Sequence, residues 1–152
     1  MNIATTKAVI NSAHSLHLYS DDYECSIINF FGEFSNIKFQ IEKKEINLIN
    51  FYNKNIINFF PKYGKIKSRL SFIIIYILSF FPLKNLIQKE KPKYLIIHLV
   101  TSLPLTLLIL FSFKTKFILR ISGFPRLNFM RKLFWKIALK KLHLITCPTR
   151  NT

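Results

Sequence analysis

The segment Lys116–Arg131 constrains the fold of this chain more than any other part of the sequence. Its first residues, Lys116–Ser122, are mostly apolar and predict a buried strand. A short loop with Gly123 and Pro125 follows, and a basic helix is expected from Asn128. Open α/β sheets build ligand sites from such units, at the carboxyl ends of their strands.

The rest of the chain supplies the other elements of an α/β fold. Helices are expected at residues 4–18, 66–81, 103–113 and 128–142, and strands at residues 25–31, 46–51, 94–100, 116–122 and 143–147. Pro82 is expected to follow the end of the second helix, and residues 53–65 are expected to form a loop. Since strands and helices alternate after residue 90, we expect one Rossmann-like, mainly parallel sheet with helices on both faces.

Charge restricts the chemistry that the chain can perform. The net charge is +16, from 23 basic and 7 acidic residues, and no carboxylate lies between Lys91 and Thr152. That half therefore lacks the paired carboxylates of glycoside hydrolysis and the oxygen ligands of a hard cation. The glycine-rich motifs that cradle phosphates are also absent. The remaining positive field suits an anionic partner.

The two cysteines do not indicate a metal site. Cys25 and Cys147 lack C-x-x-C spacing, and each lies in an apolar run that predicts a strand. We expect both to be buried free thiols in a reducing compartment, with no metal and no cofactor. The first residues show no apolar leader segment, which predicts a cytoplasmic chain.

A membrane protein with one or two spans is the main alternative. Tyr94–Phe113 is a run of 20 residues without a charged side chain, long enough for a transmembrane helix, whereas the apolar stretch Leu70–Leu83 is too short. Against a span, the long run contains His98 and Pro104. A strand, a turn and the start of a helix account for both residues.

Four segments together resemble the amino-terminal domain of glycosyltransferase family 4 enzymes. They are Lys91–His98, Lys116–Pro125, Arg131–Lys136 and Ile145–Thr152. The resemblance follows the whole chain in element order and is sharpest from Lys91 onward. It implies a GT-B fold, in which two Rossmann-like domains face each other across a cleft. The implied activity is transfer of a sugar from a nucleotide-sugar donor to a sugar or lipid-linked acceptor, as in cell-envelope polysaccharide synthesis.

The sequence departs from the family pattern at three places. Lys93 stands where the family usually has an aspartate. The family's first strand and glycine-rich loop have no counterpart before Ala4, and its donor-binding second domain has none by Thr152. The resemblance therefore implies an incomplete acceptor-side domain whose donor binds to the absent domain. We expect no sugar transfer by this chain alone, and no catalytic residue can be assigned.

Candidate ligand-binding residues lie just beyond the predicted strands. In the α/β interpretation they line the acceptor-side cleft: His98, Thr101, Ser122, Gly123, Arg126, Asn128 and Thr149. Arg126 offers a planar fork of donors for phosphate or carboxylate, and we expect it to converge with His98 and Gly123 at one sheet edge. The alternatives are a buried structural histidine, a plain turn and helix caps. Arg120, inside a strand, is expected only to extend along a sheet face.

The last predicted helix has a basic stripe. Lys132, Lys136 and Lys140 recur at every fourth residue, and Trp135 lies near the edge of the stripe. This pattern fits either a helix on an anionic membrane, at the inner face of the plasma membrane, or an ordinary solvated helix face. A basic non-catalytic binding module is a third possibility for the chain. No nucleic-acid-binding motif is present, so nucleic acid is not an expected partner.

Overall fold

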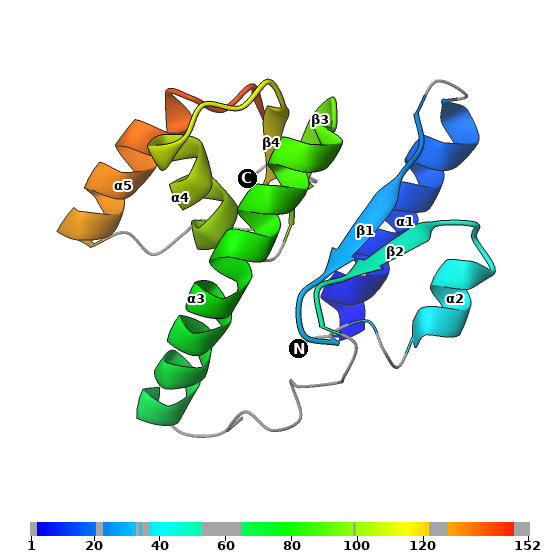
Figure 1. The fold of residues 1–152 in the computed structure, drawn as a ribbon, viewed down its shortest axis with the longest axis horizontal. Helices are drawn as coiled ribbons and strands as arrows, with labels where there is room; N and C mark the ends of the chain where they lie inside the picture. Colours follow the sequence, from blue (N-terminus) through cyan, green and yellow to red (C-terminus); the bar gives the residue numbers. More distant parts are fainter. Residues whose placement is uncertain are drawn as a thin grey trace. The chain divides into compact units, whose positions relative to one another are not determined.

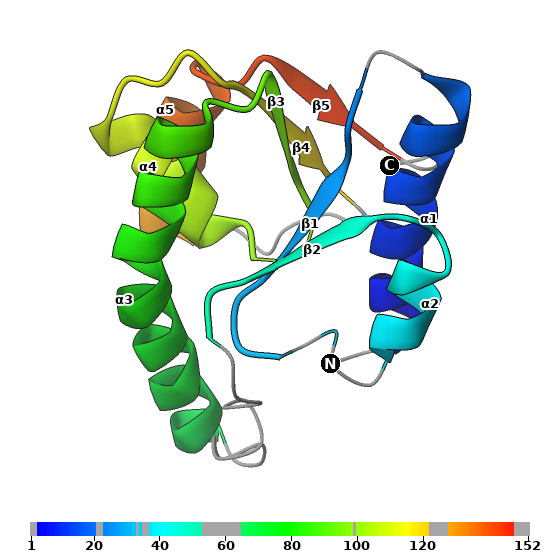
Figure 2. The same cartoon turned by 45° about the vertical axis from the view of Figure 1, so that its right-hand side comes forward.

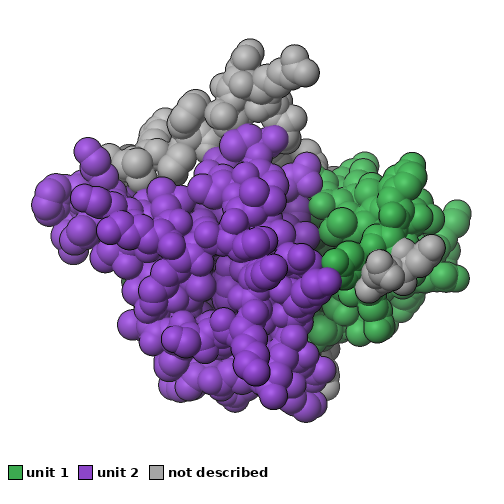
Figure 3. Space-filling view, turned by 90° about the horizontal axis from the view of Figure 1, so that it is seen from above, with its two compact units in different colours: residues 1–79 green, residues 80–152 purple. Residues whose placement is uncertain are grey.

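The computed structural model describes residues 3–20, 23–32, 34, 37–52, 65–98, 100–121 and 128–147. The chain forms two compact units, residues 1–79 and residues 80–152, which Figure 3 shows in separate colours. Each unit contains parallel strands joined by helices. The class predicted from the sequence, a parallel α/β fold, is therefore confirmed.

The first unit is built on a two-stranded parallel sheet (Figure 1). In chain order its elements are α1 (Ile3–Tyr19), β1 (Ser26–Asn29), α2 (Lys38–Glu42) and β2 (Asn47–Asn50). Strands β1 and β2 pair in register from Ser26 opposite Asn47 to Asn29 opposite Asn50. Apolar side chains from both helices and from the sheet region form one core cluster: Ile10, Ile27, Phe34, Ile41 and Ile46.

The second unit contains a three-stranded parallel sheet in the order β3-β4-β5 (Figure 2). Its elements are β3 (Tyr94–Ile97), α4 (Ser102–Leu110), β4 (Lys116–Arg120), α5 (Phe129–Leu139) and β5 (Leu144–Thr146). Helix α4 is the most deeply buried helix of this unit, with Leu103, Leu105 and Leu107 fully covered. Helices α4 and α5 pack against each other, and Lys141 donates to the carbonyl of Ile109 at the end of α4 (2.8 Å).

Helix α3 (Lys65–Glu90) connects the two units and does not end where the sequence predicted. Pro82 was expected to follow the helix, but it lies inside the helix. A proline has no N–H, so the carbonyl of Leu78, four residues earlier, loses its helical partner. The Tyr52 hydroxyl donates to that carbonyl at 3.1 Å. This side chain thus supplies a partner for the carbonyl that the proline leaves unpaired within the helix.

One other expectation about the fold is wrong, whereas the strand and helix expected within Tyr94–Phe113 are confirmed. The strands form two separate sheets, not one, because no described residue of β1 or β2 pairs with β3, β4 or β5. Tyr94–Phe113 is a strand followed by a helix, so it cannot be a single helical span. In the described part of the chain, the helix long and apolar enough to cross a membrane is instead Leu70–Glu90 of α3.

Both cysteines are free, but only one has the expected environment. Cys25 is half-buried, and its burial raises the pKa of the thiol. Cys147 is exposed, because it follows β5, a strand at the sheet edge whose Leu144 and Ile145 are also exposed. Neither cysteine belongs to a group of three metal-ligating side chains among the described residues.

Candidate functional site

The strongest candidate site lies at the carboxyl ends of β3 and β4. The parallel register places Ile97 opposite Leu119. The next residues of the two strands, His98 and Arg120, are therefore neighbours at this edge. On the other side of β4, Arg120 lies opposite Thr146 of β5. The carboxyl edge of the second unit thus combines an imidazole, a guanidinium and a hydroxyl at neighbouring register positions. The carboxyl ends of β3, β4 and β5 can be followed in Figure 2.

The surroundings of His98 disfavour the charged form of its imidazole. Burial lowers the pKa of His98 below its usual value of 6.5, and the positive charge of Arg120 lowers this pKa further. A neutral imidazole has one donor and one acceptor nitrogen. The edge therefore places one permanent cation beside an imidazole whose charged form is disfavoured.

Helix α4 begins four residues after His98 and directs its amino terminus to the same edge. The first N–H groups of an α-helix have no partner within the helix and favour anions. Thr101, at the N-cap position, makes no side-chain cap bond. The Ser102 hydroxyl oxygen is buried and has no hydrogen-bond partner among the described residues. The start of α4 therefore lacks a side-chain cap from Thr101, and the buried Ser102 hydroxyl is unpaired among the described residues.

The structure describes the positions of only some of the predicted cleft residues. His98 and Thr101 lie at the carboxyl edge, as expected. Asn128 caps α5, because its side-chain oxygen accepts from the backbone N–H of Arg131 at 2.9 Å. The other predicted cleft residues lie outside the described part of the chain: Ser122, Gly123, Arg126 and Thr149. The convergence of His98 with Gly123 and Arg126 therefore stays a prediction.

Arg120 is the site residue that the sequence reasoning passed over. It was expected only to extend along a sheet face, but it ends β4 next to His98 and influences its pKa. The sequence contains a pattern that identifies Arg120 as a neighbour of His98. If the runs that begin at Tyr94 and Lys116 are aligned as parallel neighbours, His98 and Arg120 fall at matching positions.

Helix α5 exposes apolar side chains as well as basic ones. The basic stripe, Lys132, Lys136 and Lys140, is exposed, and Trp135 is half-buried. Phe129, Met130, Leu133 and Ile137 are exposed on the same helix, whereas Ala138 is fully buried against the unit. The helix therefore has both features that an anionic membrane surface attracts, which are positive charge and apolar surface.

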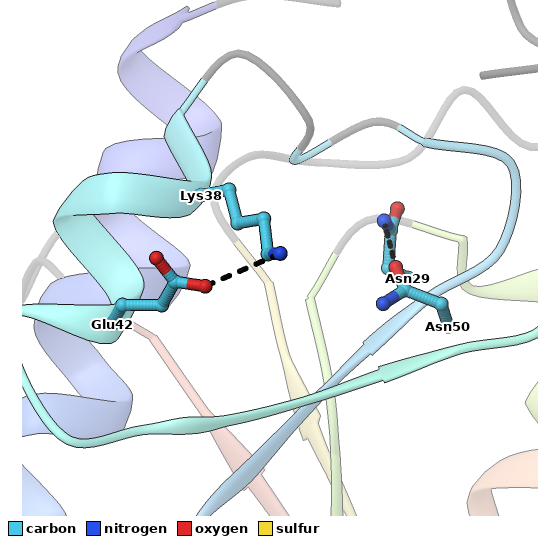
Figure 4. A network of polar contacts seen from close by, with 4 residues as sticks. All are labelled: Asn29, Lys38, Glu42 and Asn50. Carbon is cyan, nitrogen blue, oxygen red and sulfur yellow. Dashed lines mark hydrogen bonds and ion pairs between the residues drawn. The ribbon is translucent and has the colours of Figure 1, made fainter. Parts of the chain in front are cut away.

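The carboxyl edge of β1 and β2 carries a polar network that the sequence did not reveal (Figure 4). The buried Asn29 side chain accepts from the backbone N–H groups of Gly32 (3.1 Å) and Phe34 (3.5 Å). Its amide nitrogen donates to the side-chain oxygen of Asn50 at 2.6 Å. Asn29 therefore shapes the loop after β1, in which Gly32 has φ of 91°. Its bonds are internal, so we regard this network as structural.

The fold is that of a parallel α/β protein, and the carboxyl edge of its second unit carries Arg120 beside His98. The chain matches no protein-family model, no curated protein and no solved structure.

Proposed function

We propose that this chain is the acceptor-side α/β part of a nucleotide-sugar-dependent glycosyltransferase of the family 4 type. In this proposal the carboxyl edge of β3 and β4 binds an anionic group of a sugar or lipid-linked acceptor. The observation that carries the proposal is the adjacency of His98 and Arg120 at this edge, next to the first turn of α4. Doubly wound α/β domains bind their ligands at this position of the sheet.

The chemistry of the edge suits a phosphate or pyrophosphate. The Arg120 guanidinium presents a planar fork that matches two phosphate oxygens. His98 takes up a proton when the anion binds, because a nearby negative charge favours the imidazolium. The N–H groups at the start of α4 supply further donors. Together these groups would fix an acceptor in one orientation, which is a large part of what an enzyme contributes to a transfer reaction.

The charge distribution supports an anionic ligand over a neutral one. Glu90 is the only carboxylate between Ile46 and Thr152. It lies at the end of α3, before β3 begins, and so away from the carboxyl edge of the sheet. An approaching anion therefore meets a positive field. In the same proposal, Lys132, Lys136 and Lys140 of α5 attract the anionic headgroups among which a lipid-linked acceptor is found, each contributing about 1 kcal/mol near the surface.

Titration of the histidine imidazoles by NMR, with and without inorganic phosphate or pyrophosphate, tests this proposal. The signal that is missing in a His98→Gln variant identifies His98. We expect phosphate to raise the pKa of His98 toward or above 6.5, because the bound anion stabilises the imidazolium. An Arg120→Gln variant should lose most of this response, whereas Lys132→Gln on α5 should keep it.

Sodium chloride at matched ionic strength is the control for general screening. If chloride raises the pKa of His98 as much as phosphate does, the edge has no specific anion site and the proposal fails.

A further inference from the structure

Helix α3 carries a continuous apolar stripe on its exposed side. The stripe consists of Leu70, Ile73, Ile77, Leu78 and Phe81, whose side chains are between 43% and 65% exposed. Most of these residues are three or four positions apart, so they lie along one face of the helix. Single exposed apolar residues are common on protein surfaces. Five large ones on one helix face form an apolar patch, and such patches mark surfaces that bind another protein or a membrane.

The stripe is not the face with which α3 packs into the protein. Ser79, Leu83 and Ile87 lie on another side of the helix and are almost fully buried. Within the second unit, Lys84 lies over the ring of Phe111, 4.4 Å from its centroid. The helix has therefore already made its core contacts, and the stripe remains in addition to them.

The charged residues on either side of the stripe indicate which kind of surface binds to it. The sequence places Lys65, Lys67 and Arg69 just before the stripe and Lys84 after it, whereas the more distant Lys89 is ion-paired with Glu90. No carboxylate occurs between Ile46 and Lys89. An apolar strip with cationic residues at both ends complements a surface that is apolar inside and anionic at its boundary. An anionic lipid bilayer has this character.

We propose that α3 docks on an anionic lipid bilayer, with the stripe Leu70–Phe81 inserted at the level of the headgroups and the helix lying in the plane of the membrane. This inference concerns a surface that the proposed function does not use. The helix lies on the membrane and does not cross it, because crossing would remove Leu83 and Ile87 from the core. The stretch of α3 that is long and apolar enough to cross a membrane lies within Leu70–Glu90, and only 22% of it is buried in the protein. The residues of the stripe are among those that are exposed.

Sedimentation with lipid vesicles tests the proposal on the full chain. Neutral phosphatidylcholine vesicles are compared with vesicles in which part of this lipid is replaced by phosphatidylglycerol. We expect the chain to bind the anionic vesicles and the double variant Ile73→Glu, Ile77→Glu to bind at least about tenfold more weakly, since charged groups resist insertion among acyl chains. The matched control is Phe39→Glu, which changes a 77% exposed apolar side chain on α2 and should leave binding unchanged.

Three outcomes would overturn the proposal. Equal loss of binding in the Phe39→Glu variant would show that added negative charge alone is responsible. Loss in a Lys132→Gln, Lys136→Gln, Lys140→Gln variant, together with normal binding by the α3 double variant, would assign the membrane contact to α5. Sedimentation equilibrium that shows a dimer without vesicle binding, dissociated by the α3 substitutions, would assign the stripe to a second copy.

Two further measurements keep the proposal falsifiable if the double variant does not fold. Ile77→Trp in a Trp135→Phe background places the single tryptophan of the chain on the stripe. Its emission should shift to the blue with anionic vesicles, and an unchanged spectrum would refute the docking. Alkaline carbonate should release the bound chain, whereas retention would show that α3 crosses the bilayer. The phosphate titration of His98 does not depend on any of these results.

Discussion

At the scale of single residues, the pairing of Tyr52 with Leu78 is the most consequential contact. It joins the end of β2 to a helix carbonyl that Pro82 leaves without a partner. Tyr52 is held in place by its ring, which stacks on the buried Phe31 with centroids 4.8 Å apart. The helix that the sequence pattern ends at the proline thus continues to Glu90, and a tyrosine far away in the sequence pairs with the carbonyl that the proline leaves open.

Replacing Tyr52 with Phe should lower the free energy of unfolding by about 0.5–1.5 kcal/mol, the usual net worth of one hydrogen bond. In a Pro82→Ala background the same substitution should cost much less, because an alanine at that position supplies the missing N–H to the Leu78 carbonyl. Urea denaturation of the four proteins in this cycle gives the coupling between the two positions. Equal costs in both backgrounds would show that the hydroxyl does not substitute for the helix bond.

His98 should make the stability of the protein depend on pH. Its pKa is lower in the folded chain than the usual value of 6.5, so the unfolded chain binds more protons as the pH falls below about 6.5. The free energy of unfolding should therefore decrease from about pH 6.5 downward and be independent of this group at higher pH. A His98→Gln variant should show a smaller decrease in urea titrations at pH 7.5 and pH 5.5. A decrease of the same size in the variant would contradict the shift.

At the scale of helices and strands, the sequence correctly predicted the elements that a local residue pattern determines. The short apolar runs became β1, β3, β4 and β5, and the strand expected at residues 46–51 became β2. Helix α2 was not foreseen, because Lys38–Glu42 is little more than one turn and its N-cap position makes no side-chain bond. His98 was found because it follows a strand, whereas Arg120 was missed because its importance depends on how two strands align.

At the scale of the whole molecule, strand direction was predictable and strand neighbours were not. Each crossover from a strand through a helix to the next strand fixes a parallel orientation. Which strands pair is decided by contacts between distant parts of the chain. The described strands pair only within two groups, β1 with β2 and β3 with β4 and β5, and α3 occupies the sequence between the groups. A pattern read along the chain carries no direct signal of that division.

Because α3 belongs to both compact units, it determines how cooperatively the protein unfolds. The boundary between the units falls at Ser79, inside the helix. If one unit opens, its share of α3 loses the packing that supports it, while the other share keeps its own. Hydrogen exchange in moderate denaturant should divide the helix into two groups of amides, residues 65–79 and residues 80–90, with different protection. One common exchange rate along α3 would contradict this. Two such groups would also mean that a single melting temperature describes neither unit, since a two-state treatment requires the chain to unfold as one.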